Sequence, residues 1–164
     1  FATLHANSVF GAIPRLVEIG LGPELLAGNL TGILSQRLVR RLCTACRKSA
    51  PATADELSRL GIAVGTPPTE LYQAVGCPAC DFRGYRGRLA ITEILSIDTE
   101  LDELIARRAH TAELRAAARH KGFGSLAEDG LRRVLDGSTS LRELARVVDL
   151  SALTAASGAA IARP

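Results

Sequence analysis

Cys43-Thr-Ala-Cys46 and Cys77-Pro-Ala-Cys80 are the two stretches on which the folding of this chain depends. Each pair places two sulfur atoms on one tight turn, close enough to bind the same ion. Together the two turns supply four thiolates, the set that suits tetrahedral Zn²⁺ at a closed structural site. Because protein atoms then fill every coordination position, we expect the ion to be structural rather than catalytic.

Three other interpretations of the cysteines stay open at this point. The pairs could be two redox-active CxxC motifs, two disulfides or four unrelated core cysteines. Arginines flank both pairs, within residues 37–47 and 83–88, and positive charge lowers the pKa of a thiol and favours the metal-bound thiolate. The chain shows no export signal, so we expect a reducing compartment, where paired cysteines more often bind metal.

The composition permits a packed core but argues against several classes of protein. Hydrophobic residues make up 47% of the chain and aromatic residues only 4%, so aliphatic side chains must form the core. No apolar stretch approaches the length of about 20 residues that a membrane-spanning helix needs. The net charge of +3 does not by itself indicate a nucleic acid or a membrane as partner. The start, FATLHANS, is not a signal peptide, and we expect further chain to precede it.

Local patterns predict a helix-rich α+β fold. Residues 2–5 are expected to end a strand, and Asn7 or Ser8 to cap a helix that runs to about Ile19. A second helix is predicted over residues 23–42, because apolar residues recur there at a spacing of three and four: Leu26, Leu30, Ile33, Leu34 and Leu38.

The rest of the chain is expected to alternate between short strands and capped helices. In the cysteine-rich part we predict a helix over 54–60 and strands over 71–75 and 88–95. Further helices are expected to begin near Asp98 and at Thr111. Two more should follow capping boxes, which are Ser125-Leu-Ala-Glu128 and Ser140-Leu-Arg-Glu143.

The residues alone do not define an activity. No phosphate-binding loop of the form GxxxxGK[ST] occurs in the sequence. The histidines, His5, His110 and His120, are not at metal-ligand spacing to one another. On this basis the chain is a zinc-stabilised α+β module of undefined function.

Five motifs, in the same order along the chain, resemble those of the secretion-superfamily ATPases. Thr3-Leu4-His5-Ala6-Asn7 resembles the His box, TLHTN, of that family. The other segments are similar to the surroundings of its two zinc knuckles and to its helical C-terminal region: QRLVRRLC (36–43), GCPAC (76–80), GYRGR with IxE (84–93), and DG (129–130) with GxTS (137–140). The tetracysteine module indicates the type II secretion ATPases (general secretion pathway protein E) and the pilus extension ATPases, because retraction ATPases typically lack it.

The resemblance implies a hexameric P-loop ATPase at the cytoplasmic face of the bacterial inner membrane, peripheral to the membrane, that uses ATP and Mg²⁺. Its implied partners are other copies of itself, an inner-membrane platform protein and a cytoplasmic-membrane anchor, without nucleic acid. ATP hydrolysis would drive the export of pilus or pseudopilus subunits.

The resemblance also implies roles for single residues. His5 would lie beside the γ-phosphate as a catalytic residue, and Arg88 would reach toward the base of the nucleotide. The metal ligands would be Cys43, Cys46, Cys77 and Cys80. Phosphoryl transfer depends mainly on positioning and charge neutralisation, which an imidazole can provide. Alternatively, His5 is a polar residue with a structural hydrogen bond, and Arg88 is a solvated charge at a strand edge.

Some features depart from the family or point elsewhere. Ala6 replaces the usual Thr of the His box. The Walker motifs are expected upstream of Phe1, so this chain alone is not expected to hydrolyse ATP. Two other functions are a zinc-ribbon nucleic-acid-binding module and a structural interaction module. Scarce aromatic residues and a nearly balanced charge argue against the nucleic-acid-binding module.

The expected domains follow from the resemblance. Residues 1–42 would be the C-terminal piece of a RecA-like nucleotide-binding core, and residues 43–95 the tetracysteine zinc module with a small sheet. Residues 96–150 would form a helical C-terminal domain. Residues 151–164 are rich in Ala and Ser and lack periodicity, so we expect a disordered tail.

Overall fold

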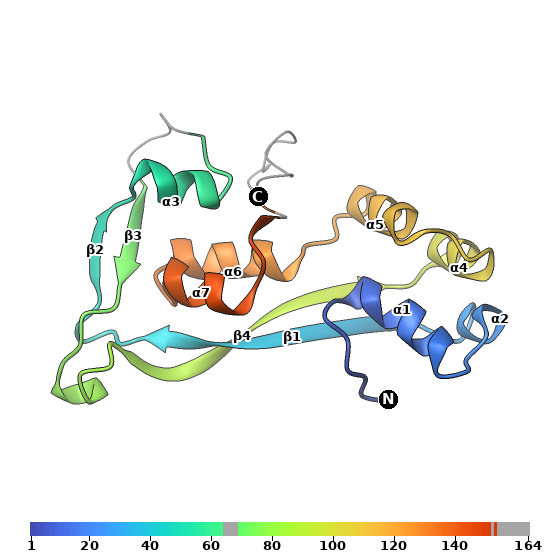
Figure 1. Ribbon diagram of the computed structural model, residues 1–164, viewed down its shortest axis with the longest axis horizontal. Helices are drawn as coiled ribbons and strands as arrows, with labels where there is room; N and C mark the ends of the chain where they lie inside the picture. The colour runs from blue at the N-terminus through green and yellow to red at the C-terminus, as the bar shows by residue number, and fades with distance from the viewer. Residues whose placement is uncertain (64–68, 152, 154–164) are drawn as a thin grey trace. The chain divides into compact units, whose positions relative to one another are not determined.

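The computed structural model describes residues 1–63, 69–151 and 153 of the chain. Helices outnumber strands in this described part, and the strands form two two-stranded sheets, β1–β4 and β2–β3 (Figure 1). The predicted helix-rich α+β class is confirmed. The chain divides into two compact units, one made of residues 1–36 and 92–125 and the other of residues 37–91 and 126 onward.

The helix predicted over residues 23–42 is wrong. α2 spans only Pro23–Leu26, and β1 (Gly32–Leu42) takes most of the stretch. α2 ends because Ala27 adopts extended backbone with ψ of 131° and Gly28 follows with φ of +75°. A side chain at a φ near +75° is strained, so glycine is suited to this turn.

The burial pattern of β1 shows why the leucine spacing wrongly predicted a helix. Leu34 and Leu38, which a helix would bury, are 59% and 53% exposed, whereas Val39 is buried. The strand forms because β4 (Tyr85–Ser96), which lies far along the sequence, supplies its hydrogen-bonding partner. No window of local sequence contains that partner, so the apolar spacing alone favoured a helix.

β1 and β4 run antiparallel. In the first unit the Ile97 N–H donates to the Thr31 carbonyl at 3.0 Å, and in the second unit the Cys43 N–H donates to the Gly84 carbonyl at 3.0 Å. The strand predicted over residues 2–5 is not present. Strands need a neighbour, and within the described residues none lies against this segment.

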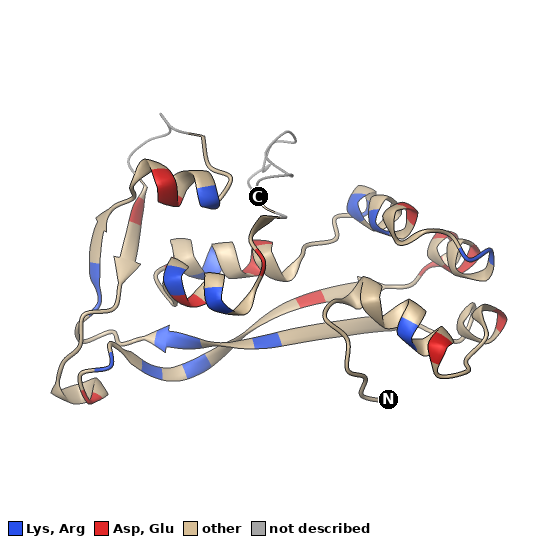
Figure 2. Ribbon diagram, in the orientation of Figure 1, with Lys and Arg blue, Asp and Glu red and all other residues tan. Residues whose placement is uncertain are grey.

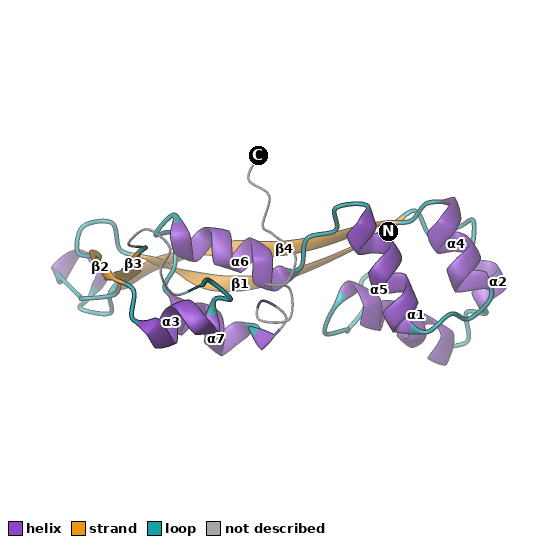
Figure 3. Ribbon diagram, turned by 90° about the horizontal axis from the view of Figure 1, so that it is seen from above, coloured by secondary structure: helices purple, strands orange, loops and turns teal. Residues whose placement is uncertain are grey.

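Four helices build the first unit (Figure 3). They are α1 (Val9–Glu18), α2, α4 (Thr99–Ala106) and α5 (Thr111–His120). Ser8 and Asp98 cap α1 and α4 through their side-chain oxygens, as expected for helix starts. Phe10 packs edge-on against Phe123 with ring centroids 5.0 Å apart. The rest of this core is mostly aliphatic, as the composition predicted.

Glu93 of β4 also caps α1. Its Oε1 accepts a hydrogen bond of 2.8 Å from the Val9 N–H, and the residue is only 5% exposed. The first N–H groups of a helix lack partners within the helix, and a carboxylate there also interacts favourably with the helix dipole. Sequence reasoning placed Glu93 in a family motif without finding this role.

Among the residues that the structure describes, the second unit combines a hairpin with three helices. β2 (Lys48–Pro51) pairs antiparallel with β3 (Glu70–Gln73), with Ser49 opposite Tyr72. The helices are α3 (Ala54–Arg59), α6 (Leu126–Leu135) and α7 (Leu141–Val147), and a 3₁₀ turn, η1, spans Pro78–Cys80. Leu153 is buried in this core, while the remainder of the predicted tail beyond Ser151 lies outside the described residues.

The carboxylate of Glu143 connects α7 to β1 through hydrogen bonds. Ser140 accepts a hydrogen bond from the Glu143 N–H as the predicted capping box requires, but the carboxylate turns elsewhere. It accepts from the Arg40 backbone N–H at 3.1 Å, from the Arg40 guanidinium at 2.6 and 2.9 Å, and from Arg146 at 2.8 Å. Burial raises the pKa of this fully buried carboxyl, but Arg146 and Arg40 outweigh burial and lower the pKa to about 2.

We expect the replacement Glu143→Gln to lower the free energy of unfolding by about 1–3 kcal/mol, because charged hydrogen bonds are lost. The pH dependence has a definite sign. The folded pKa of about 2 lies below the unfolded value of about 4.3, so the contribution is present above about pH 5 and is lost as the pH falls toward 2. Urea unfolding at pH 7 and at acid pH measures both effects.

A matched control is Glu18→Gln, because Glu18 pairs with Arg15 on the surface. Exposed pairs contribute only about 0–1 kcal/mol. Equal losses in the two variants would contradict a special role for Glu143.

Candidate metal centre

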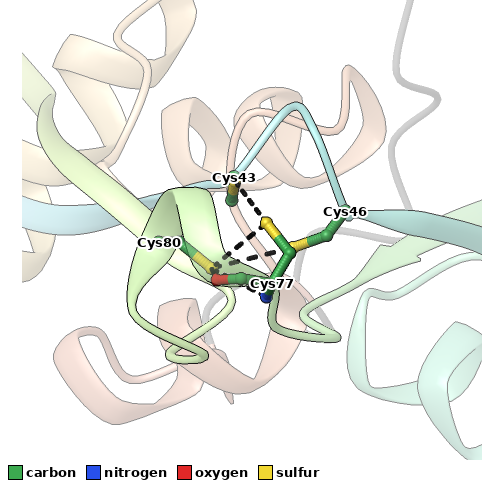
Figure 4. A group of neighbouring side chains, drawn as sticks. All are labelled: Cys43, Cys46, Cys77 and Cys80. Carbon is green, nitrogen blue, oxygen red and sulfur yellow. Dashed lines mark hydrogen bonds between the residues drawn. The ribbon is translucent and has the colours of Figure 1, made fainter.

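The four cysteines come from two turns of the second unit. Cys43 and Cys46 lie between β1 and β2, and Cys77 and Cys80 lie at η1, between β3 and β4. Figure 4 shows their sulfur atoms pointing toward one another, and all four lie within 4.8 Å of each other.

The distances between the sulfurs fit one ion. Sγ of Cys43 lies 3.9 Å from that of Cys77, Sγ of Cys46 lies 3.9 Å from that of Cys80, and the Cys77 and Cys80 sulfurs are 3.8 Å apart. Ligands at about 2.3 Å from a tetrahedral zinc ion are about 3.8 Å from each other. A disulfide requires about 2.05 Å, and all four cysteines are free. The cluster could therefore hold a metal ion, and it is neither two disulfides nor four unrelated core thiols.

Backbone N–H groups point at the sulfurs. The Gly76 N–H donates to Cys46 Sγ at 3.3 Å, and the N–H groups of Cys77 and Gly84 donate to Cys80 Sγ at 3.3 and 3.2 Å. Such donors stabilise negative charge on sulfur. They are therefore placed to support thiolate ligands around a cation.

Burial and these donors shift the pKa values of Cys80 and Cys46 in opposite directions. Burial opposes ionisation of Cys80, but the N–H groups of Cys77 and Gly84 outweigh burial and lower the pKa of this thiol to about 7. At Cys46, burial and hydrogen bonds with the neighbouring thiols outweigh the Gly76 N–H and raise the pKa to about 11. A divalent cation would favour the thiolate form of both, so metal binding would release protons and strengthen as the pH rises.

Three of the flanking arginines make contacts away from the sulfur atoms. Arg40 binds Glu143 and stacks over Tyr85, and Arg83 binds Asp81 at 2.6 Å. Arg47 donates to the Gly137 carbonyl and lies over the ring of Tyr72. Hydrogen bonds, first from backbone N–H groups, lower the pKa of Cys80.

Two glycines allow the second cysteine turn to close. Gly76 and Gly84 have φ values of +114° and +73°, a region that side chains rarely adopt. A Cβ on Gly76 would lie 2.6 Å from the Phe82 carbonyl oxygen, and one on Gly84 would lie 2.7 Å from the Cβ of Ala74. Sequence reasoning noted both glycines within family motifs but missed that their N–H groups contact sulfur.

The structure places His5 and Arg88 in different units. His5 precedes α1 in the first unit and is exposed, without a hydrogen bond or ion pair among the described residues. Arg88 lies on β4 in the second unit and is exposed. It lines a cavity of about 550 Å³ together with Cys80 and three other arginines, Arg40, Arg83 and Arg86.

These features define an α+β protein whose second unit is organised around a four-cysteine cluster. The chain belongs to the family of type II/IV secretion system proteins, whose model matches residues 1–146.

Curated relatives agree with this assignment. The chain is 43% identical to the type II secretion system protein E of Pseudomonas aeruginosa over 146 residues, which cover 89% of this chain and 29% of that protein. It is 43% identical to the type IV pilus assembly ATPase PilB of Myxococcus xanthus over 148 residues, covering 87% of this chain and 26% of the relative. Identity with the type II secretion system ATPase E of Vibrio cholerae is 42%, over 89% of this chain and 29% of that protein.

The chain thus spans less than a third of the length of the curated relatives that it matches. No helix in its described part is both long and apolar enough to cross a bilayer.

Gly84→Ala should weaken the metal centre, and Gly87→Ala provides a matched control. Both glycines have positive φ, +73° and +78°, but a Cβ on Gly87 meets nothing within 4 Å. Gly87→Ala should therefore cost only the backbone strain, about 1–2 kcal/mol. Gly84→Ala adds the collision with Ala74 and should lose metal at a lower chelator concentration. Chelator titration followed by thermal unfolding measures both, and equal behaviour of the two variants would contradict this account.

Proposed function

We propose that the chain is the C-terminal part of a hexameric ATPase that powers type II protein secretion or type IV pilus assembly. The family match over residues 1–146 carries this proposal, because the relatives bear those names. In the proposed ATPase, residues 1–42 belong to a RecA-like nucleotide-binding core, residues 43–95 to a zinc module and residues 96–150 to a helical C-terminal domain.

The metal of the proposed site is Zn²⁺ with a structural role. Four thiolates form a soft, tetrahedral ligand set that zinc prefers, and no coordination position is left for a substrate. The ion would fasten the turn at 43–46 to the turn at 76–84. The N–H groups of Gly76, Cys77 and Gly84 would hold the thiolates in place.

The nucleotide role rests on His5 and Arg88. The exposed imidazole of His5 has no partner among the described residues and is accessible to a terminal phosphate. Arg88 likewise makes no ion pair in the described part and projects from β4 into an arginine-lined cavity, where it could contact a bound nucleotide. ATP would bring Mg²⁺, and charge neutralisation of the phosphates would be the chemical contribution of this chain.

The proposed partners follow from the same assignment. The chain would contact other copies of itself in a ring, an inner-membrane platform protein and a membrane anchor, at the cytoplasmic face of the inner membrane. ATP hydrolysis would then drive the export of pilus or pseudopilus subunits. Two functions compete with this proposal: a zinc-ribbon module that binds nucleic acid, and a structural module. DNA binding that weakens steeply with salt would favour the nucleic-acid-binding module.

Metal analysis tests the zinc assignment. We expect stoichiometric zinc in the purified chain, and Cys80→Ser should abolish its retention. Such sites contribute about 10–16 kcal/mol to coupled binding and folding in zinc-finger peptides, so chelation should sharply raise hydrogen exchange in residues 43–47 and 76–84. Thr44→Ala, an exposed change in the same turn, should keep the metal. A metal-free chain with unchanged exchange would refute the assignment.

ATP turnover tests the motor assignment. The chain alone should show no hydrolysis above the blank, because it contains no phosphate-binding loop. In the longer protein that the proposal requires, His5→Ala should lower kcat about 100-fold, the effect of removing one stabilising donor. His120→Ala, an exposed change at the end of α5, is the control. Turnover by the isolated chain, or full activity of His5→Ala, would contradict the proposal.

A further inference from the structure

A groove of about 750 Å³ lies in the second unit between β3 and α7. We call it the β3–α7 groove. Residues 71–74 form one wall, and α7 with the residue before it forms the other. The rest of the lining is Arg40, Glu56, Arg83 and Tyr85. The α7 wall consists of Ser140, Leu141, Arg142, Ala145 and Arg146. The metal centre does not use this groove.

One wall of the groove runs along the edge of a strand. Four consecutive residues, 71–74, line it. Successive side chains of a strand point to opposite faces, so a consecutive run lines a cavity that lies at the strand edge rather than on one face. β3 pairs only with β2 in the described residues, and its other edge makes no backbone hydrogen bond outside the hairpin and its turn. Such an edge can accept an added extended segment.

The groove presents positive charge. Arg142 is exposed and makes no hydrogen bond or ion pair within the described part of the chain. Arg40 and Arg146 share the carboxylate of Glu143, which has no exposed side-chain surface, whereas their own side chains are 47% and 61% exposed. The guanidinium groups therefore face the solvent while the balancing carboxylate lies behind them. Figure 2 shows basic segments, coloured blue, on both β1 and α7.

The aromatic rings of the groove do not suit nucleic acid. Bases of single strands stack on open aromatic faces. The guanidinium of Arg40 covers one face of Tyr85 at 4.2 Å, and that of Arg47 covers one face of Tyr72 at 4.6 Å. The Tyr85 hydroxyl is also held by Ser140 at 2.7 Å. Half-buried Ala145 adds an apolar contact for a peptide, whereas Leu71 and Leu141, also in the lining, are only 2% and 5% exposed.

We propose that the β3–α7 groove binds an extended acidic peptide segment of a protein partner, which adds a strand to the free edge of β3. Backbone hydrogen bonds to β3 would provide affinity, and carboxylates facing α7 would be recognised by Arg142 and Arg146. Guanidinium forks match carboxylates in shape and charge, which fixes the register of the segment.

A labelled short peptide of alternating Glu and Val tests this site by fluorescence anisotropy on the metal-loaded chain. We expect saturable binding that weakens with salt, and loss of binding when Gln replaces Glu in the peptide. Arg142→Glu should weaken binding at least about tenfold, because like charges then face each other. Arg59→Glu makes the same charge change on α3, outside the groove, and should leave binding unchanged.

Two further arms make the test decisive. A peptide with Pro in place of every Val loses half of its backbone donors and is restricted to φ near −65°, so it should add poorly to β3; equal binding of this peptide would refute strand addition. Single-stranded DNA that competes with the peptide and loses binding equally in Arg142→Glu would show a general polyanion surface and overturn the proposal. Absence of peptide binding, or equal weakening by Arg59→Glu, would also overturn it. None of these outcomes depends on ATP turnover, so they are independent of the proposed motor function.

Discussion

The convergence of four sulfur atoms is the constraint on which the second unit depends. The two cysteine turns belong to loops that are far apart in sequence. Two hydrogen bonds join them directly: the Gly76 N–H donates to Cys46 Sγ, and the Cys43 N–H donates to the Gly84 carbonyl. Thiols at such short separations repel once they ionise, so the arrangement is stable as a set of thiolates only around a cation. The glycines at 76 and 84 then become necessary, because the turn must close tightly enough to bring both sulfurs to one point.

A second constraint is the buried carboxylate of Glu143. One side chain satisfies a backbone N–H of β1 and two guanidinium groups at once, which fixes α7 against the strand beside the cysteine turn. The Thr139 hydroxyl adds a hydrogen bond of 2.8 Å to the Arg40 carbonyl. A buried charge with fewer partners would destabilise the fold, so the arginines are structural as well as cationic.

Sequence patterns predicted the features that are local and failed where the partner was distant. The helices at 99–106 and 111–120, and the burial of Leu101, Leu104 and Leu114, follow from caps and spacing within each segment. β1 was predicted as a helix because its partner β4 lies some fifty residues further along the chain. In the site, the CxxC spacing predicted that the sulfurs would meet. The N–H donors and the Glu143 network could not be predicted. The direction of backbone N–H groups and the pairing of residues far apart in the chain cannot be inferred from a short stretch of sequence.

The division of the chain into interleaved units also affects how it can fold during synthesis. The first core includes residues up to Phe123, and the second core includes α7. Neither core can therefore form when only the N-terminal part of the chain has left the ribosome. The cysteine turns, in contrast, are both available once Cys80 has emerged. Binding of an ion at that moment would close the loop from Cys43 to Cys80 before either core exists. It would also reduce the number of conformations open to the chain when the later helices pack.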